Sequence, residues 1–201
     1  MDQKQKIFCQ AEELFLRYGV KSVTMDDLAS HLGVSKKTLY QHFDNKSDLV
    51  EKTLSAHLDL EKEAVLAIKE QSANAIEEIF KLGQHVSGHL QTMNPSILFD
   101  LKRYYPKAWA IMEAHKNVFI YQHILNNIKR GKSENLYRQD IDPEIIARIY
   151  LNMINMIIQP ELQVEQQEVV RHYEEYLSYH VRGIASKEGF KVLEALNQQQ
   201  S

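Results

Sequence analysis

The chain has 201 residues, of which only 7 are glycine and 4 are proline. Average usage would give about 24 of the two together, so the chain has few turns and long elements. This disfavours β-sandwiches and barrels, which need a turn about every 8–12 residues. The charged fraction of 25% and the net charge of −3 are typical of a folded chain, and they exclude a protein that is basic overall.

Cysteine usage and the longest apolar segment bear on the compartment. Cys9 is the one cysteine, so an internal disulfide is excluded and a reducing compartment, the cytoplasm, is expected. The N-terminal segment mixes charged and apolar residues at helical spacing, and we expect no signal peptide there. The longest apolar-rich stretch, residues 145–158, contains Arg148 and is too short and too polar to cross a membrane.

The predicted helices of the N-terminal quarter are short and begin at clear caps. Apolar residues recur on one helical face up to Tyr18, and Gly19 is suited to end that helix in the left-handed conformation. Small polar residues then precede three apolar-periodic segments, in the patterns Thr24-x-x-Asp27, Ser35-x-x-Thr38 and Asn45-x-x-Asp48. The helices predicted from these starts cover about 25–32, 36–43 and 46–70.

The remainder of the chain predicts longer helices, delimited by proline and glycine. Asn94-Pro95 and Asp142-Pro143 each combine a cap with a proline in the first turn, and Pro106 opens another helix. Gly131 and Pro160 are expected to end helices. The predicted helices cover about 75–92, 95–104, 106–130, 143–159 and 164–186, with a polar loop over 131–141 and a frayed tail.

The most informative segment is residues 24–46, which predicts two short helices joined by a tight turn. Ala29 lies where the helices approach most closely, and Gly33 supplies the left-handed residue that the turn needs. The outer positions of the second helix carry side chains that donate hydrogen bonds to phosphates and base edges. These are Lys36, Lys37, Thr38, Tyr40, Gln41 and His42. From spacing alone, DNA binding and an ordinary solvated helical hairpin both remain open.

This segment and the helix before it resemble the DNA-binding domain of the TetR family of bacterial transcriptional regulators. The similarity spans about 50 residues and four elements. The matching residues are Ile7, Ala11, Leu14, Phe15, Gly19, Val23, Thr24, Leu28, Ala29, Leu32, Gly33, Val34, Ser35, Thr38, Leu39, Tyr40, His42, Phe43, Lys46 and Leu49.

The resemblance implies an all-α protein with two domains. Residues 1–46 would form a homeodomain-like, three-helix helix-turn-helix domain, and residues 47–201 a helical domain for effector binding and dimerisation. It also implies DNA-binding roles for eight residues, which hold the backbone or face the major groove. These are Thr24, Ser35, Lys36, Lys37, Thr38, Tyr40, His42 and Lys46. Asp26 stands where some members carry a basic residue, so base reading is expected from the third helix alone.

Two further assignments concern the C-terminal part. The predicted helices over 143–159 and 164–186 suit a four-helix bundle with a second copy, although they could equally complete one subunit's core. Aromatic and methionine side chains between residues 93 and 156 could line an effector pocket, although core packing would explain them as well. The candidates are Phe99, Tyr104, Tyr105, Trp109, Met112, Tyr121, Tyr150 and Met153.

The function expected from these observations is a ligand-responsive repressor that binds a palindromic operator as a homodimer and is released by a small molecule. We expect no cofactor and no metal, since His85 and His89 are four residues apart but lack the glutamate of a zincin between them, where Val86 stands. Two alternatives are a helical interaction module with a degenerate helix-turn-helix and a helical-bundle enzyme, for which no converging catalytic set is visible.

Overall fold

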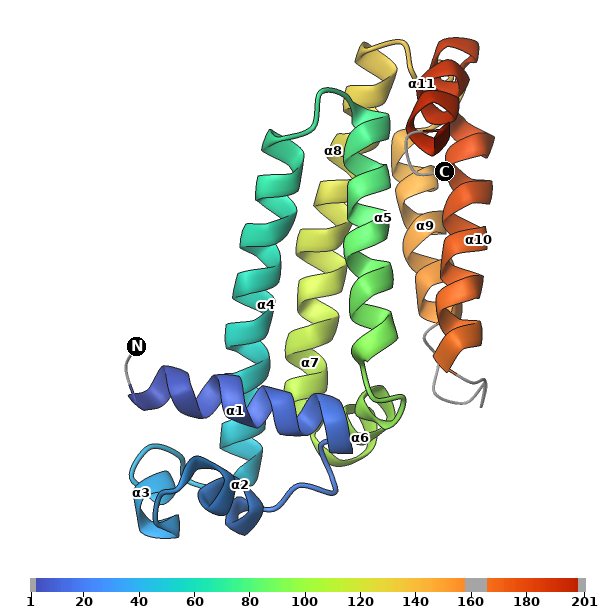
Figure 1. Cartoon of the computed structure of the whole chain (residues 1–201). Helices are drawn as coiled ribbons and strands as arrows, with labels where there is room; N and C mark the ends of the chain where they lie inside the picture. The colour runs from blue at the N-terminus through green and yellow to red at the C-terminus, as the bar shows by residue number, and fades with distance from the viewer. Residues whose placement is uncertain (1–2, 158–165, 199–201) are drawn as a thin grey trace. The chain divides into compact units, whose positions relative to one another are not determined.

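The computed structural model describes residues 3–157 and 166–198, and helices dominate these ranges (Figure 1). Tyr137 and Ala185 form an isolated β-bridge. The predicted helix end at Pro160 and the predicted start at residue 164 lie outside the described residues. The helices are α1 (Gln3–Tyr18), α2 (Met25–Leu32), α3 (Lys36–Tyr40), α4 (Lys46–Glu70), α5 (Ala75–Thr92), α6 (Ser96–Tyr104), α7 (Pro106–His115), the π-helix η1 (Lys116–Ile120), α8 (Tyr121–Ser133), α9 (Pro143–Ile157), α10 (Gln166–Ile184) and α11 (Lys187–Gln198).

The chain packs as two compact units. Unit 1 contains residues 1–62 and 92–115, and unit 2 contains residues 63–91 and 116–201. The first three helices therefore share their packing unit with most of α4 and with α6 and α7. The division at residue 46, which was drawn by function, remains a prediction.

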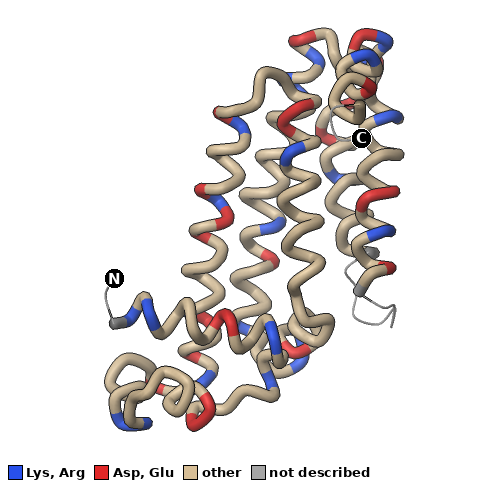
Figure 2. The backbone as a smooth tube through the Cα atoms, viewed as in Figure 1, with Lys and Arg blue, Asp and Glu red and all other residues tan. Residues whose placement is uncertain are grey.

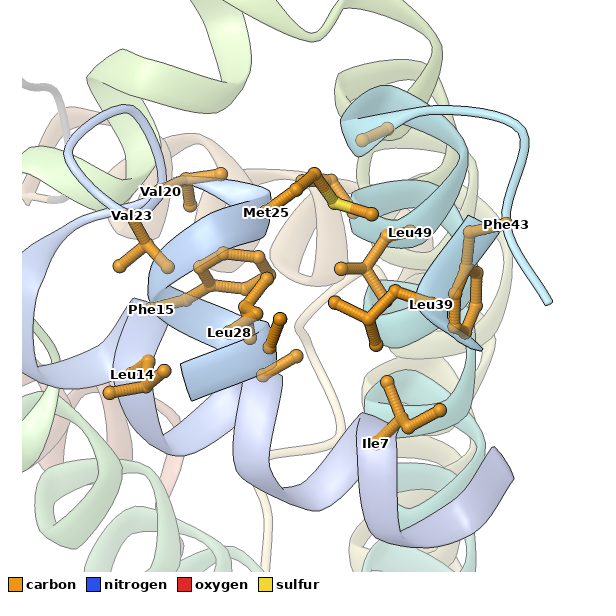
Figure 3. Packing of buried hydrophobic residues seen from close by; sticks show 14 of the residues in the cluster. Ile7, Leu14, Phe15, Val20, Val23, Met25, Leu28, Leu39, Phe43 and Leu49 are labelled. Carbon is orange, nitrogen blue, oxygen red and sulfur yellow. The ribbon is translucent and has the colours of Figure 1, made fainter. Parts of the chain in front are cut away.

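The core of unit 1 forms where α1, α2, α3 and the start of α4 converge (Figure 3). Leu28, Leu39 and Leu49 come from three of these helices and are fully buried. Ile7 and Phe15 of α1 pack against them and are almost as deeply buried. Burying a side chain of this size stabilises the fold by about 1.5–3 kcal/mol, which explains why helices too short to persist alone form here.

The cap patterns of the sequence are confirmed at these helices. Thr24 Oγ1 accepts from the Asp27 N–H (3.1 Å), and the Asp27 carboxylate accepts in return from the Thr24 N–H (2.8 Å), which makes a capping box. Ser35 Oγ accepts from the Thr38 N–H and Asn45 Oδ1 from the Asp48 N–H, at 3.1 and 3.0 Å. Gly33 has φ +64°, the left-handed value that the turn requires.

A buried charged network lies inside unit 2. Glu78 of α5 is 1% exposed and contacts Arg130 Nη1 at 2.9 Å and His123 Nε2 at 3.0 Å, both from α8. Arg130 also binds the Glu134 carboxylate (2.7 Å) and the Ser72 carbonyl (3.0 Å). Burial alone would raise the pKa of Glu78, but the hydrogen bonds from His123 and Arg130 outweigh it and hold the pKa below its usual value. The network ties α8 to α5 and to the loop before it.

The structure corrects three predicted boundaries. α3 ends at Tyr40 instead of continuing to residue 43, because the His42 N–H bonds to the Leu39 carbonyl in a tighter turn that brings Phe43 into the core. Gly131 lies inside α8 instead of ending it, and a Cβ there would meet the Tyr137 ring. The left-handed residue after α8 is Asn135, with φ +58°.

The tail was expected to fray, but it contains α11 up to Gln198. Ser186 begins this helix, because its Oγ accepts from the Gly189 N–H at 3.1 Å. The Ser186 N–H in turn donates to the Leu136 carbonyl at 2.9 Å, which attaches the start of α11 to the segment after α8. The prediction was wrong because it treated the polar composition near Asn197 as a sign of disorder and overlooked this cap.

Candidate nucleic-acid interface

Helices α2 and α3 form a helix-turn-helix. The Val34 N–H donates to the Ala29 carbonyl at 3.0 Å, which closes the turn at Gly33. Leu39 is fully buried and anchors α3, so the opposite face of this short helix is presented to solvent. Figure 2 shows that this part of the chain carries both basic and acidic residues.

The exposed face of α3 carries the predicted base-reading groups. Lys36, Lys37 and Tyr40 are exposed, whereas Thr38 and His42 are half-buried. Tyr40 is 46% exposed, which is a large apolar surface for water to cover unless a partner does so. A helix that presents lysines and a tyrosine beside its N-terminus fits the phosphates and base edges of a major groove.

Lys36 has a partner within the protein. Its Nζ lies 2.9 Å from Asp26 Oδ1 of α2, and both side chains are largely exposed. The hydrogen bond and charge of Asp26 raise the pKa of Lys36. Asp26 was expected to be unable to approach a phosphate, and the structure gives it a defined contact instead, in which it neutralises one lysine of the helix that follows.

Three of the predicted backbone-holding residues serve as caps. The Thr24 hydroxyl donates to Asp27 Oδ2 at 2.7 Å while it caps α2. The hydroxyls of Ser35 and Thr38 lie 2.8 Å apart at the start of α3. These groups fix the two helix N-termini, and the N–H groups of a fixed N-terminus point outwards toward any anion placed there.

Lys46 is held more tightly than a free surface lysine. Its Nζ donates to the Lys21 carbonyl at 3.0 Å and lies 5.7 Å from the centre of the Tyr105 ring. Partial burial lowers the pKa of Lys46. The first residue of α4 therefore fastens the loop between α1 and α2, a role that the sequence did not reveal.

A family model described as "Bacterial regulatory proteins, tetR family" matches residues 7–53, which cover α1 to α3 and the start of α4. The chain is also 30% identical over 149 residues to YvaF of Bacillus subtilis strain 168, an uncharacterized HTH-type transcriptional regulator, and the match covers 73% of this chain and 76% of YvaF. The chain belongs to the TetR family. It is a helix-turn-helix transcriptional regulator that binds DNA.

Other relatives of this TetR-family regulator match it more loosely. IcaR of Staphylococcus aureus strain Newman, a negative transcriptional regulator of the biofilm operon icaADBC, is 28% identical over 78 residues, or 39% of this chain and 42% of IcaR. The crystal structure of a regulator from Saccharomonospora viridis in complex with choline superposes with a TM-score of 0.71 at 21% identity, covering 92% of this chain and 98% of that one. This second likeness establishes the fold alone.

The candidate effector residues of this TetR-family chain fall in both packing units. In unit 1, Phe99 and Tyr104 are largely exposed and pack edge to face, with ring centres 6.2 Å apart. Tyr105, Trp109 and Met112 are half-buried and pack against the core of the same unit. In unit 2, Tyr150 is buried, while Tyr121 and Met153 are half-buried. Their role in binding a ligand remains a prediction.

Two cavities are lined mainly by residues that the sequence did not single out. One in unit 2 has a volume of about 480 Å³ and lies among α5, α10 and α11, with Gln84 and Glu174 on its wall. The other lies in unit 1, has a volume of about 160 Å³, and is lined by α1, α4, α6 and α7, including Met112. The apolar periodicity of α1 and α4 marks these residues as core, so no sequence signal separates cavity-lining positions from packed ones.

Within unit 1, hydrogen bonds join the end of α1 to α6 and the residues before it. The Asn94 N–H donates to the Leu16 carbonyl (3.0 Å), and the Asn94 side chain donates to the Arg17 carbonyl (3.1 Å). Asp100, which is 5% exposed, accepts from the Lys21 N–H at 2.8 Å. The turn at Gly19 (φ +81°) lies between these contacts. A displacement of α6 would therefore move the end of α1. Over the part of the chain that is described, no helix is both long and apolar enough to cross a bilayer.

Proposed function

We propose that this regulator is a repressor that binds a pseudo-palindromic operator as a homodimer and leaves it when a small molecule binds. The observation that carries the proposal is the exposed face of α3, where Lys37 and Tyr40 project beside a capped helix N-terminus. In a dimer, two such helices would enter successive major grooves about 34–36 Å apart. The negative regulator IcaR, which shares the N-terminal segment, supports repression.

An exposed apolar stripe on α9 supports the dimer. Ile145, Ile149 and Met156 are between 46% and 57% exposed and recur at helical spacing on one face. Tyr179 of α10 is 77% exposed. Large apolar side chains that gather on adjoining helices are typical of an interface, and a second copy would cover the same patch on both subunits.

We expect Ile149→Glu to convert the dimer into a monomer, because the charge would have to be buried against its own copy in a two-fold interface. Analytical ultracentrifugation of the full chain measures the mass directly. Glu144→Gln, on the same helix, is the control and should remain dimeric. A dimer that survives Ile149→Glu with unchanged affinity would place the interface elsewhere.

We expect Lys37→Ala and Lys46→Ala to affect operator binding differently in gel-shift titrations. Lys37→Ala should change the base preference, at about 1–3 kcal/mol for the base pair that it reads. Lys46→Ala should weaken binding to all sequences and, if it removes a phosphate contact, reduce the slope of log K against log salt by about 1.

The salt slope separates two roles of Lys46, since the side chain also holds the Lys21 carbonyl. A lower affinity with an unchanged slope would mean that Lys46 acts only by fixing the loop, and the phosphate role would be wrong. Lys62→Ala, far along α4 from its N-terminus and paired with Asp59, is the control and should leave both quantities unchanged.

A small-molecule effector is supported by the cavities of both units and by the choline complex of the Saccharomonospora viridis regulator. Release requires that the effector bind the DNA-free conformation more tightly than the DNA-bound one, because equal affinity for both would shift nothing. Gel shifts on the DNA flanking the chain's own gene, with and without small-molecule extracts, test the whole proposal. Absence of a shifted band at low salt would favour the interaction module with a degenerate helix-turn-helix.

A further inference from the structure

We infer that the apolar cavity of unit 1 binds a ring-sized, uncharged molecule that carries one hydroxyl group, and that Thr53 recognises this hydroxyl. The inference rests on the proposed function, since it assigns the class and the place of the effector. The cavity is lined by 14 residues of α1, α4, α6, α7 and the segments beside them, and most of these are apolar.

The size of the cavity sets the size of the ligand. Its volume is about 160 Å³. In another protein, an engineered apolar cavity of about 150 Å³ stays dry and binds benzene. A single six-membered ring with one small substituent therefore fills the space, whereas fused ring systems do not fit.

Thr53 gives the cavity its polar point. The residue is 5% exposed and lies on the cavity wall, and among the residues that the structure describes no group hydrogen-bonds to its Oγ1. A buried hydroxyl without a partner is costly, so such groups are rare in folded proteins and indicate a water or ligand partner. Its surroundings include Val50, Leu54 and Leu98, which offer no partner of their own.

The charged residues on the wall compensate each other. His57 Nδ1 lies 2.6 Å from Glu12 Oε1, and the hydrogen bond from Glu12 raises the pKa of His57. A ligand with a net charge would lose its hydration in an otherwise apolar cavity without gaining an unpaired counter-charge there. The lining therefore selects for an uncharged molecule.

The position of the cavity connects it to DNA binding. Phe15 and Leu16 of α1 form one wall, and Leu101 of α6 forms another. Phe15 and Leu101 also belong to the buried cluster that holds α2 and α3 in place (Figure 3). A ligand that enlarges the cavity changes the support of the helix-turn-helix directly, within the same unit.

The test uses phenol and toluene, which have the same ring and differ in the hydroxyl. Isothermal titration calorimetry on the full chain should show phenol binding about tenfold more tightly than toluene, which is the ratio expected for one hydrogen bond to an otherwise unpaired group. Thr53→Val keeps the side-chain shape and removes the hydroxyl, so it should abolish this preference. The same variant should raise Tm by about 2–4 °C, because a buried unpaired hydroxyl is lost. Thr92→Val, at an exposed threonine, is the matched control and should change neither quantity.

A second variant blocks the space. Leu54→Trp places a larger ring in the cavity and should abolish binding of both probes. Failure of phenol to bind the wild-type chain, or an equal preference for phenol in Thr53→Val, would overturn the inference. Gel shifts with operator DNA are read separately: operator binding that saturating phenol leaves unchanged would overturn the assignment of the cavity as the effector site. Absence of operator binding without any probe would instead contradict the proposed function.

Discussion

Arg130→Met is expected to lower the free energy of unfolding by about 3 kcal/mol. Arg130 neutralises Glu78, which is 1% exposed, and the methionine would leave that carboxylate buried with His123 as its remaining ionisable neighbour. Removing one partner of a buried ion pair typically costs about 3–5 kcal/mol, and the lower end applies because the Arg130 side chain is itself 27% exposed. Urea unfolding followed by circular dichroism measures the change.

The control is Arg171→Met, since Arg171 is 72% exposed and lies 3.6 Å from Glu168. It should change stability by less than about 0.5 kcal/mol. In the double variant Arg130→Met/Glu78→Leu the buried charge is gone, and we expect it to recover part of the lost stability. If Arg130→Met cost no more than Arg171→Met, the network would contribute nothing measurable.

Acidification from pH 7 to pH 4 is expected to cost about 3 kcal/mol of stability through His180 alone. This side chain of α10 is 7% exposed, with its ring centre 5.1 Å from that of Tyr150 and 5.8 Å from that of Tyr176. Burial lowers the pKa of His180 from 6.5 to about 4. Between these values the unfolded chain binds a proton that the folded chain does not, so stability falls as the pH falls.

The aromatic neighbours do not titrate in this range, because burial raises the pKa values of Tyr150 and Tyr176. The measurement is the free energy of unfolding at a series of pH values for the wild type and for His180→Gln. The glutamine variant cannot take up the proton, so its stability should fall less steeply, by about 2 kcal/mol between pH 7 and pH 5. Parallel curves for the two proteins would mean that His180 is protonated equally easily in both states. His172→Gln, at an exposed position of the same helix, should reproduce the wild-type slope.

The parts of the fold that the sequence predicts depend on local chemistry. The capping box at Thr24 and Asp27, the cap at Ser35 and the left-handed turn at Gly33 each involve residues within a few positions of one another. The bounds of α2, α4 and α5 match the predicted ranges for the same reason. The helix-turn-helix is therefore readable from the sequence, and so is the exposed face of α3.

The remaining features depend on partners that are distant in the chain. Gly131 was assigned to a helix end because glycine commonly ends helices, whereas its function here is to make room for the Tyr137 ring. Glu78 has the spacing of an ordinary surface glutamate, and its burial follows from Arg130, which lies 52 residues away. Thr53 likewise cannot be told from a solvated threonine until the helices around it are assembled.

The contact between Asp26 and Lys36 has a consequence for how the regulator searches a genome. A regulator spends most of its time on DNA that is not its operator, where binding depends almost entirely on neutralised phosphates. Because Lys36 already has a counter-charge 2.9 Å away, we expect it to release fewer condensed ions from arbitrary DNA than a free lysine would. The acidic residue then shortens each non-specific stop, and discrimination between the operator and the many competing sites improves without any additional base contact.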